Sequence, residues 1–284
     1  MEHDVPEELV GSLEATAREI RRDVIRMTCA AGSGHPGTSF SVTDLLTALV
    51  FHELRVDPTR PGWPDRDRLV LSKEHAAPAL YAALVHRGFL PREEILSLPR
   101  SGRRRSGPVD RAPLPGLEAS IGGSGEATGM AVGMALDARL DRRPSCVFAV
   151  LSEAECQAGA TWEALLAGGH HQLRNLVVVL NRNGYEPDGP TEAIVGIEPV
   201  AEKFRAFRFH TLEIDGHDFR EILGAFASAR ATTGGPTAIV ASTVTGKGVS
   251  FLENVHDPQA RALSKAEAER ALIELGVPPA EAVR

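Results

Sequence analysis

Apolar residues recur along the chain with two alternating spacings. Short runs of apolar, often β-branched residues are typical of strands buried on both faces, and they are separated by segments with helical spacing. The predicted strands are Arg68–Ser72, Cys146–Leu151, Leu176–Asn181, His210–Ile214 and Thr237–Thr243. The predicted helices are Leu9–Ala31, Ser41–His52, Ala76–His86, Glu126–Leu140, Gly159–Leu173, Val200–Ala206, Asp218–Ala229 and Lys265–Leu275.

This alternation predicts an α/β fold with a parallel sheet flanked by helices on both faces. The chain has 284 residues and no internal repeat, so we expect residues 1–284 to form a single domain. Hydrophobic residues make up 43% of the chain and aromatic residues only 5%, so the core must consist of Ala, Val, Leu and Ile. The segment Ser101–Gly116 mixes Arg, Gly and Pro without a period and predicts a long irregular loop.

Composition and charge exclude several classes of protein. The net charge of −7 argues against nucleic-acid binding, because no net positive field would gather phosphates. The one basic cluster, Arg103–Arg105, is interpreted as part of a solvated loop. The three cysteines fit reduced thiols. The start of the chain lacks the apolar core of a signal peptide, and no apolar run reaches the length of about 18 residues that spans a membrane. We therefore expect a cytoplasmic protein without membrane contact.

Polar side chains follow two neighbouring strands where each strand ends. Glu153 and Glu155 come after the strand Cys146–Leu151, and Asn183 comes after Leu176–Asn181. In open parallel sheets, ligands bind outside the carboxyl ends of the strands. Oxygen ligands of this kind suit Mg²⁺ or Ca²⁺, which commonly bridge to a diphosphate. Taken alone, acidic residues and asparagines at strand ends are more often turn formers and caps.

An ordered series of segments resembles the transketolase family, whose cofactor is thiamine diphosphate. The spacing between Glu153 and Asn183 is similar to its metal motif, Gly-Asp-Gly followed after about thirty residues by Asn. The other matching segments lie in the same order as in the family. They are Gly32–Gly37, Asp65–His75, Leu114–Glu118, Gly159–Ala164, His170–Leu176 and Lys247–Asn254. The resemblance covers nearly the whole chain and implies the pyrophosphate-binding domain of the thiamine-diphosphate fold.

The resemblance implies roles for individual residues. His35 and His75 would lie beside the cofactor as catalytic and cofactor-binding groups, since His exchanges protons near neutral pH. Without their flanking motifs, both would be interpreted as structural histidines. The remaining candidates bind the metal, the cofactor or the substrate. The metal ligands would be Glu153, Asn183 and the Tyr185 carbonyl. The residues in contact with the cofactor would be Gly122, Ser124, Ala154, Glu155, Asn183 and Tyr185. The residues on the substrate side would be His256, Gln259 and Lys247.

The sequence departs from the family pattern at several of these positions. The metal-binding Asp is replaced by Glu153, which adds a methylene and displaces the carboxylate by roughly 1.5 Å. Its glycine neighbours are replaced by Ser152 and Ala154, and Glu155 is an alternative ligand. An interface carboxylate is replaced by Ala158. One histidine of the family is absent from Gly107–Pro113. A second falls at Gln259, where only His256 could substitute.

These observations lead to an expected function with two alternatives. The chain lacks residues for the family's second and third domains. We therefore expect a heterotetramer that contains two copies of this chain and two of a separately encoded C-terminal subunit. The pair would transfer a two-carbon ketol unit between sugar or ketol substrates, in a specialised pathway. The first alternative is a degenerate scaffold or regulatory subunit that binds little cofactor. The second is the α-subunit of a related thiamine-dependent 2-oxoacid enzyme, although the loop at His35 argues against it.

Overall fold

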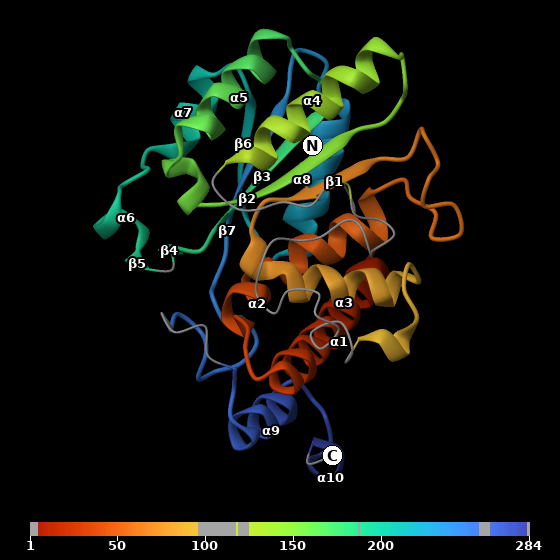
Figure 1. The fold of residues 1–284 in the computed structure, drawn as a ribbon, viewed down its shortest axis with the longest axis vertical. Coiled ribbons are helices and arrows are strands. Elements are labelled where there is room, and N and C mark those ends of the chain that lie inside the picture. Colours follow the sequence, from red (N-terminus) through yellow and green to blue (C-terminus); the bar gives the residue numbers. More distant parts are fainter. Residues whose placement is uncertain (1–4, 96–117, 119–124, 187, 256–261, 283–284) are drawn as a thin grey trace.

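A five-stranded parallel sheet forms the centre of the protein (Figure 1). The computed structural model describes residues 5–95, 118, 125–186, 188–255 and 262–282. Across the sheet the strands have the order β1-β2-β3-β7-β6, and every neighbouring pair is parallel. The strands are β1 (Arg68–Leu71), β2 (Val147–Ser152), β3 (Leu176–Arg182), β6 (His210–Asp215) and β7 (Thr237–Ser242).

Helices cover both faces of the sheet. One face carries α1 (Glu7–Ala31), α2 (Pro36–Ala48), α3 (Ala77–Arg87) and α8 (Phe219–Ala231), and α9 (Lys265–Glu274) packs against α1 away from the sheet. The other face carries α4 (Glu126–Leu140), α5 (Gly159–His170) and α7 (Val200–Ala206). The shorter helices are a π-helix at Leu49–Glu53, 3₁₀-helices at Glu74–Ala76, Arg92–Glu94 and Ala154–Gln157, and the α-helices α6 (Thr191–Ile194) and α10 (Pro279–Ala282). Strands β4 (Tyr185–Glu186) and β5 (Gly189–Pro190) form a separate hairpin.

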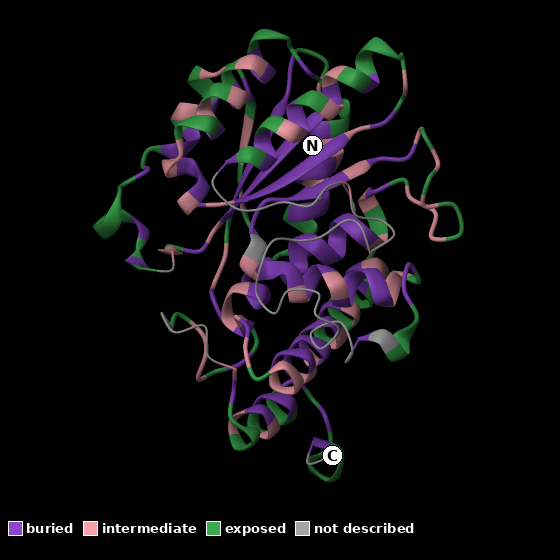
Figure 2. Ribbon diagram, viewed as in Figure 1, coloured by how far each residue is buried: buried purple, intermediate pink, exposed green. Residues whose placement is uncertain are grey.

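Alternate residues of each strand pack into two separate apolar layers. In β2, Phe148 and Val150 face the α1 side, whereas Val147, Ala149 and Leu151 face the α4 side. All five of these side chains are fully buried, and Figure 2 shows the strands as buried through most of their length. Full burial of a Val, Leu or Phe side chain stabilises the fold by about 1.5–3 kcal/mol relative to its exposure to water. The all-apolar strands of the sequence are therefore explained by burial on both faces.

The predicted fold class and the predicted helices and strands are confirmed, with small differences at their ends. The largest difference is in α2, which begins at Pro36 and not at Ser41. Proline is well suited to the first helical position, where its missing N–H costs no hydrogen bond. The β4–β5 hairpin and α6 were not predicted, because two-residue strands leave no periodic signal. Within the described part of the chain, no helix is both long and apolar enough to cross a membrane.

The register of the sheet brings the polar strand ends to one edge. Ser152 at the end of β2 pairs with Asn181, and Arg182 at the end of β3 pairs with Ser242. Because the strands are parallel, the loops that follow β1, β2, β3 and β7 all leave from this carboxyl edge. The site therefore lies here.

Candidate active site at the carboxyl edge of the sheet

Glu153 joins the carboxyl ends of β2 and β3. The residue is only 3% exposed, and its Oε2 accepts hydrogen bonds from the backbone N–H groups of Asn183 at 2.9 Å and Gly184 at 2.8 Å. Burial raises the pKa of its carboxyl group, although the charge of Lys73 and the two backbone N–H groups act in the opposite direction. A carboxylate held at a strand end against this desolvation is suited to a cationic ligand.

Glu155 is hydrogen-bonded to the end of β2. Its Oε2 accepts hydrogen bonds from the backbone N–H of Ser152 at 2.8 Å and from the Ser152 hydroxyl at 3.0 Å, so it closes its own loop. The geometry therefore favours Glu153 over Glu155 as the carboxylate that faces Asn183. Ala154 lies between them, in the 3₁₀ turn.

Lys73 places a buried cation at the same edge. It follows β1, is 6% exposed, and its Nζ donates a hydrogen bond to Oδ1 of Asn181. Burial lowers the pKa of Lys73 to about 8, against the raising effect of the charges of Glu153 and Glu155. At neutral pH the ammonium group is still protonated. The site thus holds one cation beside two carboxylates, all three largely removed from water.

Ser41 connects helix α2 to the end of β3. The side-chain amide of Asn181 donates to the Ser41 carbonyl at 3.1 Å and to the Thr243 hydroxyl at 2.8 Å. The Asn183 amide donates to the Ser41 hydroxyl at 3.3 Å, and Oδ1 of Asn183 accepts from the backbone N–H of Tyr185 at 3.0 Å. These bonds fix the two asparagines and orient the turn that carries the Tyr185 carbonyl.

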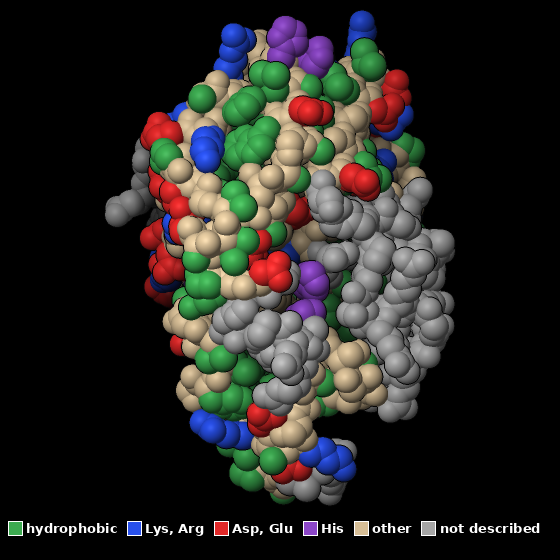
Figure 3. Space-filling view, turned by 60° about the vertical axis from the view of Figure 1, so that its left-hand side comes forward, with side chains coloured by type: hydrophobic (Ala, Val, Ile, Leu, Met, Phe, Trp, Pro, Cys, Tyr) green, Lys and Arg blue, Asp and Glu red, His purple; other side chains and the backbone are tan. Residues whose placement is uncertain are grey.

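His35 and His75 meet edge to face, although they lie 40 residues apart in the sequence. Their ring centroids are 4.4 Å apart at an interplanar angle of 76°. His35 immediately precedes α2, and His75 lies in the 3₁₀ turn after β1. Histidine side chains are visible in a hollow of the surface in Figure 3. A Cβ atom on Gly34, whose φ is +138°, would lie 2.6 Å from Cγ2 of Thr28, so the loop before His35 requires glycine.

Comparison with known proteins identifies this arrangement. Residues 13–284 match the family described as "Transketolase, thiamine diphosphate binding domain". The chain belongs to the transketolase family. It is 36% identical over 241 residues to the 6-deoxy-6-sulfo-D-fructose transketolase subunit SqwG of Clostridium sp., covering 85% of this chain and 88% of that protein. It is 33% identical to one of the subunits of the apulose-4-phosphate transketolase of Phocaeicola vulgatus, covering 87% of each chain.

Whole transketolases are longer than this chain. Mouse transketolase is 35% identical over 282 residues, which are 96% of this chain but 43% of the mouse protein. The crystal structure of transketolase from Campylobacter jejuni superposes with a TM-score of 0.88 at 28% identity, covering 95% of this chain and 43% of that one. The fold of this chain is therefore that of the thiamine-diphosphate-binding part of a transketolase.

The residues at the edge fit a metal–diphosphate group, on the chemistry of their donors. Glu153 and Asn183 offer oxygen ligands, and Lys73 offers a buried positive charge that can face a phosphate. Among the residues that the structure describes, no three His, Cys, Asp or Glu side chains cluster closely enough to hold a metal. Mg²⁺ bound by few protein groups normally completes its shell with phosphate oxygens and water. One carboxylate at the β2–β3 junction would be enough protein charge for such a site.

Five further predicted site residues do not lie at the β2–β3 junction or fall outside the described part of the chain. Gly122, Ser124, His256 and Gln259 lie outside the described residues. Lys247 lines a cavity of about 370 Å³ together with Arg18, Arg21, Asp44, His217 and Glu274, and this cavity is not lined by His35, His75 or Glu153.

Gly125, at the start of α4, lies against the amino end of α5. A Cβ atom on Gly125 would lie 2.5 Å from the Thr161 hydroxyl and 3.0 Å from the Thr161 backbone nitrogen. Its φ of +83° is also in the region that favours glycine. The close approach of the two helix ends therefore requires glycine at the start of α4.

Sequence reasoning did not assign roles to Lys73, Ser41 or Asn181. A signal for Lys73 was present, because a lysine directly after an apolar strand lies at the ligand-binding edge of a parallel sheet. No comparable signal exists for Ser41. Its contacts depend on how α2 packs across the strand ends, which the helical period does not specify.

Proposed function

We propose that the chain is the cofactor-binding subunit of a two-component, transketolase-like enzyme that transfers a two-carbon ketol unit from a ketose-type donor to an aldehyde-type acceptor. The observation that carries this proposal is the buried Glu153 bonded across to Asn183 and Gly184, on a chain of the transketolase family. Support comes from two relatives named as transketolase subunits, which this chain covers to 88% and 87% of their length.

Glu153, Asn183 and the Tyr185 carbonyl would hold Mg²⁺, or alternatively Ca²⁺, against the diphosphate. The bonds from Asn183 and Gly184 already fix one oxygen of Glu153, so its longer side chain is held in place and not left mobile. Lys73 would neutralise phosphate charge, because it is protonated at neutral pH and lies at the same edge. The backbone at Gly122, Ser124 and Ala154, with Glu155 fixing its loop, would contact the cofactor.

His35 and His75 would bind substrate oxygens and move protons at their ring nitrogens. Thiamine diphosphate supplies the carbanion chemistry when it is bound, and the protein orients it and sets the surrounding charge. The two imidazoles are acid–base groups of the neutral pH range that the structure brings together. His256 and Gln259 are proposed on the substrate side, where the histidine pattern departs from the family. This departure favours a specialised donor or acceptor.

The second component would be a C-terminal transketolase subunit, in a heterotetramer with two of each chain. Two exposed apolar side chains support the proposal that a partner binds near Asn183. They are Ile194 and Val195, which are 45% and 54% exposed just beyond the β4–β5 hairpin. Activity is expected only from the complex. Reconstitution of both chains with thiamine diphosphate, Mg²⁺ and a panel of ketose donors tests this. Full activity of the isolated chain would disprove the two-component proposal, and a complex that binds no cofactor at millimolar concentration would support the scaffold alternative.

Glu153→Gln tests the metal site directly. Glutamine can still accept the two backbone hydrogen bonds, but it lacks the charge that attracts Mg²⁺. We expect the Mg²⁺-dependent affinity of the complex for thiamine diphosphate to fall about tenfold or more, with the thermal unfolding temperature unchanged or raised. Glu155→Gln is the matched variant in the same loop, and Glu202→Gln is a surface control. A larger loss for Glu155→Gln than for Glu153→Gln would reassign the metal ligand.

A further inference from the structure

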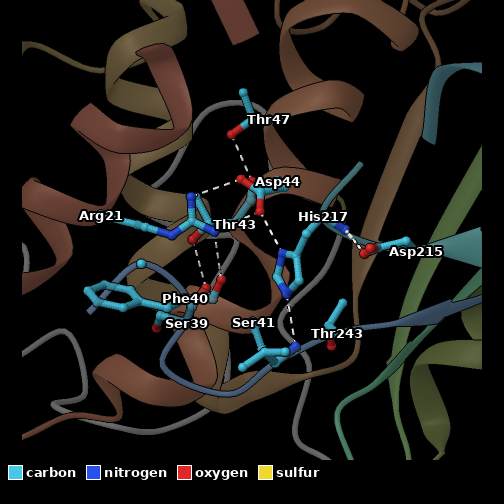
Figure 4. A network of polar contacts seen from close by, with 12 residues as sticks. Arg21, Ser39, Phe40, Ser41, Thr43, Asp44, Thr47, Asp215, His217 and Thr243 are labelled. Carbon is cyan, nitrogen blue, oxygen red and sulfur yellow. Dashed lines mark hydrogen bonds and ion pairs between the residues drawn. The ribbon is translucent and has the colours of Figure 1, made fainter. Parts of the chain in front are cut away.

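A chain of four polar groups connects helix α1 to the segment after β7 (Figure 4). The Arg21 guanidinium donates to both carboxylate oxygens of Asp44, at 2.8 and 2.7 Å. Oδ2 of Asp44 lies 2.7 Å from Nδ1 of His217, and Nε2 of His217 lies 2.8 Å from the backbone nitrogen of Val244. Arg21, Asp44 and His217 thus join α1, α2 and the β6–α8 loop to one backbone amide.

The backbone amide determines the protonation state of the ring. A backbone N–H can only donate, so Nε2 of His217 accepts the bond from Val244 and carries no proton. The ring proton is then on Nδ1 and is donated to Asp44. The backbone N–H of His217 also donates to the Asp215 carboxylate at 2.8 Å, which fixes the loop. A second proton on Nε2 would oppose the Val244 N–H and break that bond.

Val244 lies between two contacts of the proposed active site. Thr243, before it, accepts the amide hydrogen bond of Asn181. Gly246, after it, donates its backbone N–H to the Gly37 carbonyl at 3.0 Å, two residues from His35. A Cβ atom on Gly37 would lie 3.1 Å from the Thr245 hydroxyl, so the two segments are in close contact.

Helix α2 presents one face to these groups. Gly37, Ser41 and Asp44 are spaced four and three residues apart, which places them on the same side of the helix. They contact Gly246, Asn181 and His217 respectively. Three contacts therefore hold α2, which begins directly after His35, against the loops at the carboxyl end of the sheet. The contact with His217 is the one farthest from His35.

We propose that neutral His217 is a positioning residue, which holds segment 243–246 against Gly37 and thereby fixes His35, and that protonation of His217 releases this segment. The inference rests on the proposed function only for its effect on catalysis. The hydrogen bonds of the His217 ring go to Asp44 and to the Val244 amide. His217 acts through these two groups.

Charged groups of both signs surround His217. They are the carboxylates of Asp44 and Asp215 and the guanidinium of Arg21. Asp44 is ionised near neutral pH, because Arg21 and the bond from His217 lower its pKa although burial acts against its charge. The cavity of about 370 Å³ beside the ring adds Glu14, Arg18, Lys247 and Glu274 to this environment and opens the network to solvent.

Two substitutions test the two hydrogen bonds of the His217 ring one at a time. His217→Gln can place a carbonyl oxygen near the position of Nε2 and keep the Val244 bond, whereas His217→Asn can place an amide nitrogen near Nδ1 and keep only the Asp44 bond. In the reconstituted complex we expect kcat to fall about ten- to hundredfold for His217→Asn and by much less for His217→Gln. The Gln variant should also lose the fall in kcat that His217 protonation causes in the wild type at acid pH.

Hydrogen–deuterium exchange of segment 243–246 provides a readout that does not need catalysis. The protection factors of these amides, which correct for the slower intrinsic exchange at acid pH, should decrease in His217→Asn and in the acidified wild type, but not in His217→Gln at neutral pH. His86→Gln is the control, since His86 forms a similar 2.8 Å contact with Asp23 between α1 and α3. Unchanged exchange in His217→Asn would overturn the positioning role. If exchange responds as expected but the complex transfers no ketol unit from any donor, the proposed function fails and the positioning role stands.

Discussion

Buried charged side chains lie at both ends of the parallel sheet, but the extent to which hydrogen bonds and opposite charges compensate their burial differs between the two ends. At the amino end, the fully buried Asp67 accepts hydrogen bonds from Arg55 at 3.0 Å, Arg230 at 2.7 Å and the backbone N–H of Cys146 at 2.8 Å. These donors lower the pKa of Asp67, although burial acts in the opposite direction. The negative charge of Asp67 is therefore compensated by groups of the folded chain, without a ligand.

At the carboxyl end, burial outweighs the available partners. The pKa of Glu153 is raised and that of Lys73 is lowered to about 8, so both charged forms are disfavoured there. Charges that are held against desolvation in this way are typical of functional sites, where a ligand supplies the missing compensation. The difference indicates that the amino end of the sheet stabilises the fold, while the carboxyl end is arranged for binding.

The largest effect is expected at the amino end. Asp67→Asn leaves Arg230 beside a neutral amide, so the free energy of unfolding should fall by about 3–5 kcal/mol, as measured by urea denaturation. Because the folded-state pKa of Asp67 is lowered, its contribution is present above the ordinary carboxyl pKa and is lost as the pH falls through the lowered value. Cofactor affinity should be unchanged. Asp57→Asn, at an exposed pair with Arg60, is the control and should not move the midpoint.

The next effect has the same sign of pH dependence but lies in the alkaline range, because the lowered pKa of Lys73 reflects a buried charge that destabilises the fold at neutral pH. Lys73 titrates at about 8 in the folded protein and at 10.5 when unperturbed. Between these values the unfolded chain binds a proton that the folded chain does not, so the free energy of unfolding should rise with pH by up to about 3 kcal/mol. Lys73→Met should remove this rise when wild type and variant are denatured across pH 7.5–10.5. Parallel curves for the two proteins would contradict the assignment of a lowered pKa to Lys73.

The smallest effect concerns the connection between α2 and β3. Ser41→Ala removes a buried hydroxyl that contacts Asn181 at 3.0 Å and Asn183 at 3.3 Å. We expect the free energy of unfolding to fall by about 1 kcal/mol. Calorimetric titration with thiamine diphosphate and Mg²⁺ should also show a severalfold weaker affinity. Thr16→Ala, which removes an exposed helical hydroxyl, is the matched control. A loss of stability without any loss of affinity would place Ser41 with the structural residues of the amino end.

Much of the fold could be predicted because each segment has a local signal. The apolar runs of β2 and β3 require burial on both faces, and the spacing in α1 requires one apolar side. Gly32 ends α1 with φ of +65°, as its sequence context indicated. The start of α2 was placed too late because Pro36 follows a histidine loop whose conformation depends on its neighbours. The hairpin after Asn183 is too short to have a period.

The candidate site was predictable only in part. Glu153, Asn183, His35 and His75 carry motif spacing, and the structure brings them to one edge. An unshifted alignment with the family motif favours Glu153 over Glu155, because Glu153 falls on the position of the metal-binding Asp. The hydrogen bonds of Asn183 and Gly184 to Glu153, and of Ser152 to Glu155, favour the same choice. Lys247 matched a family segment, yet its side chain lines the cavity beside Arg21.

The order of helices and strands, the family and the residue types at the strand ends could all be obtained from the sequence, because periodicity, glycine positions and spacing are local properties. Which of those residues share an environment depends on packing between distant segments. Arg21, Asp44, His217 and Val244 are separated by up to 223 residues, and they meet because α1, α2 and the strand ends pack together. The pKa values of Lys73 and Glu153 likewise follow from burial, which arises when the sheet and helices close around them.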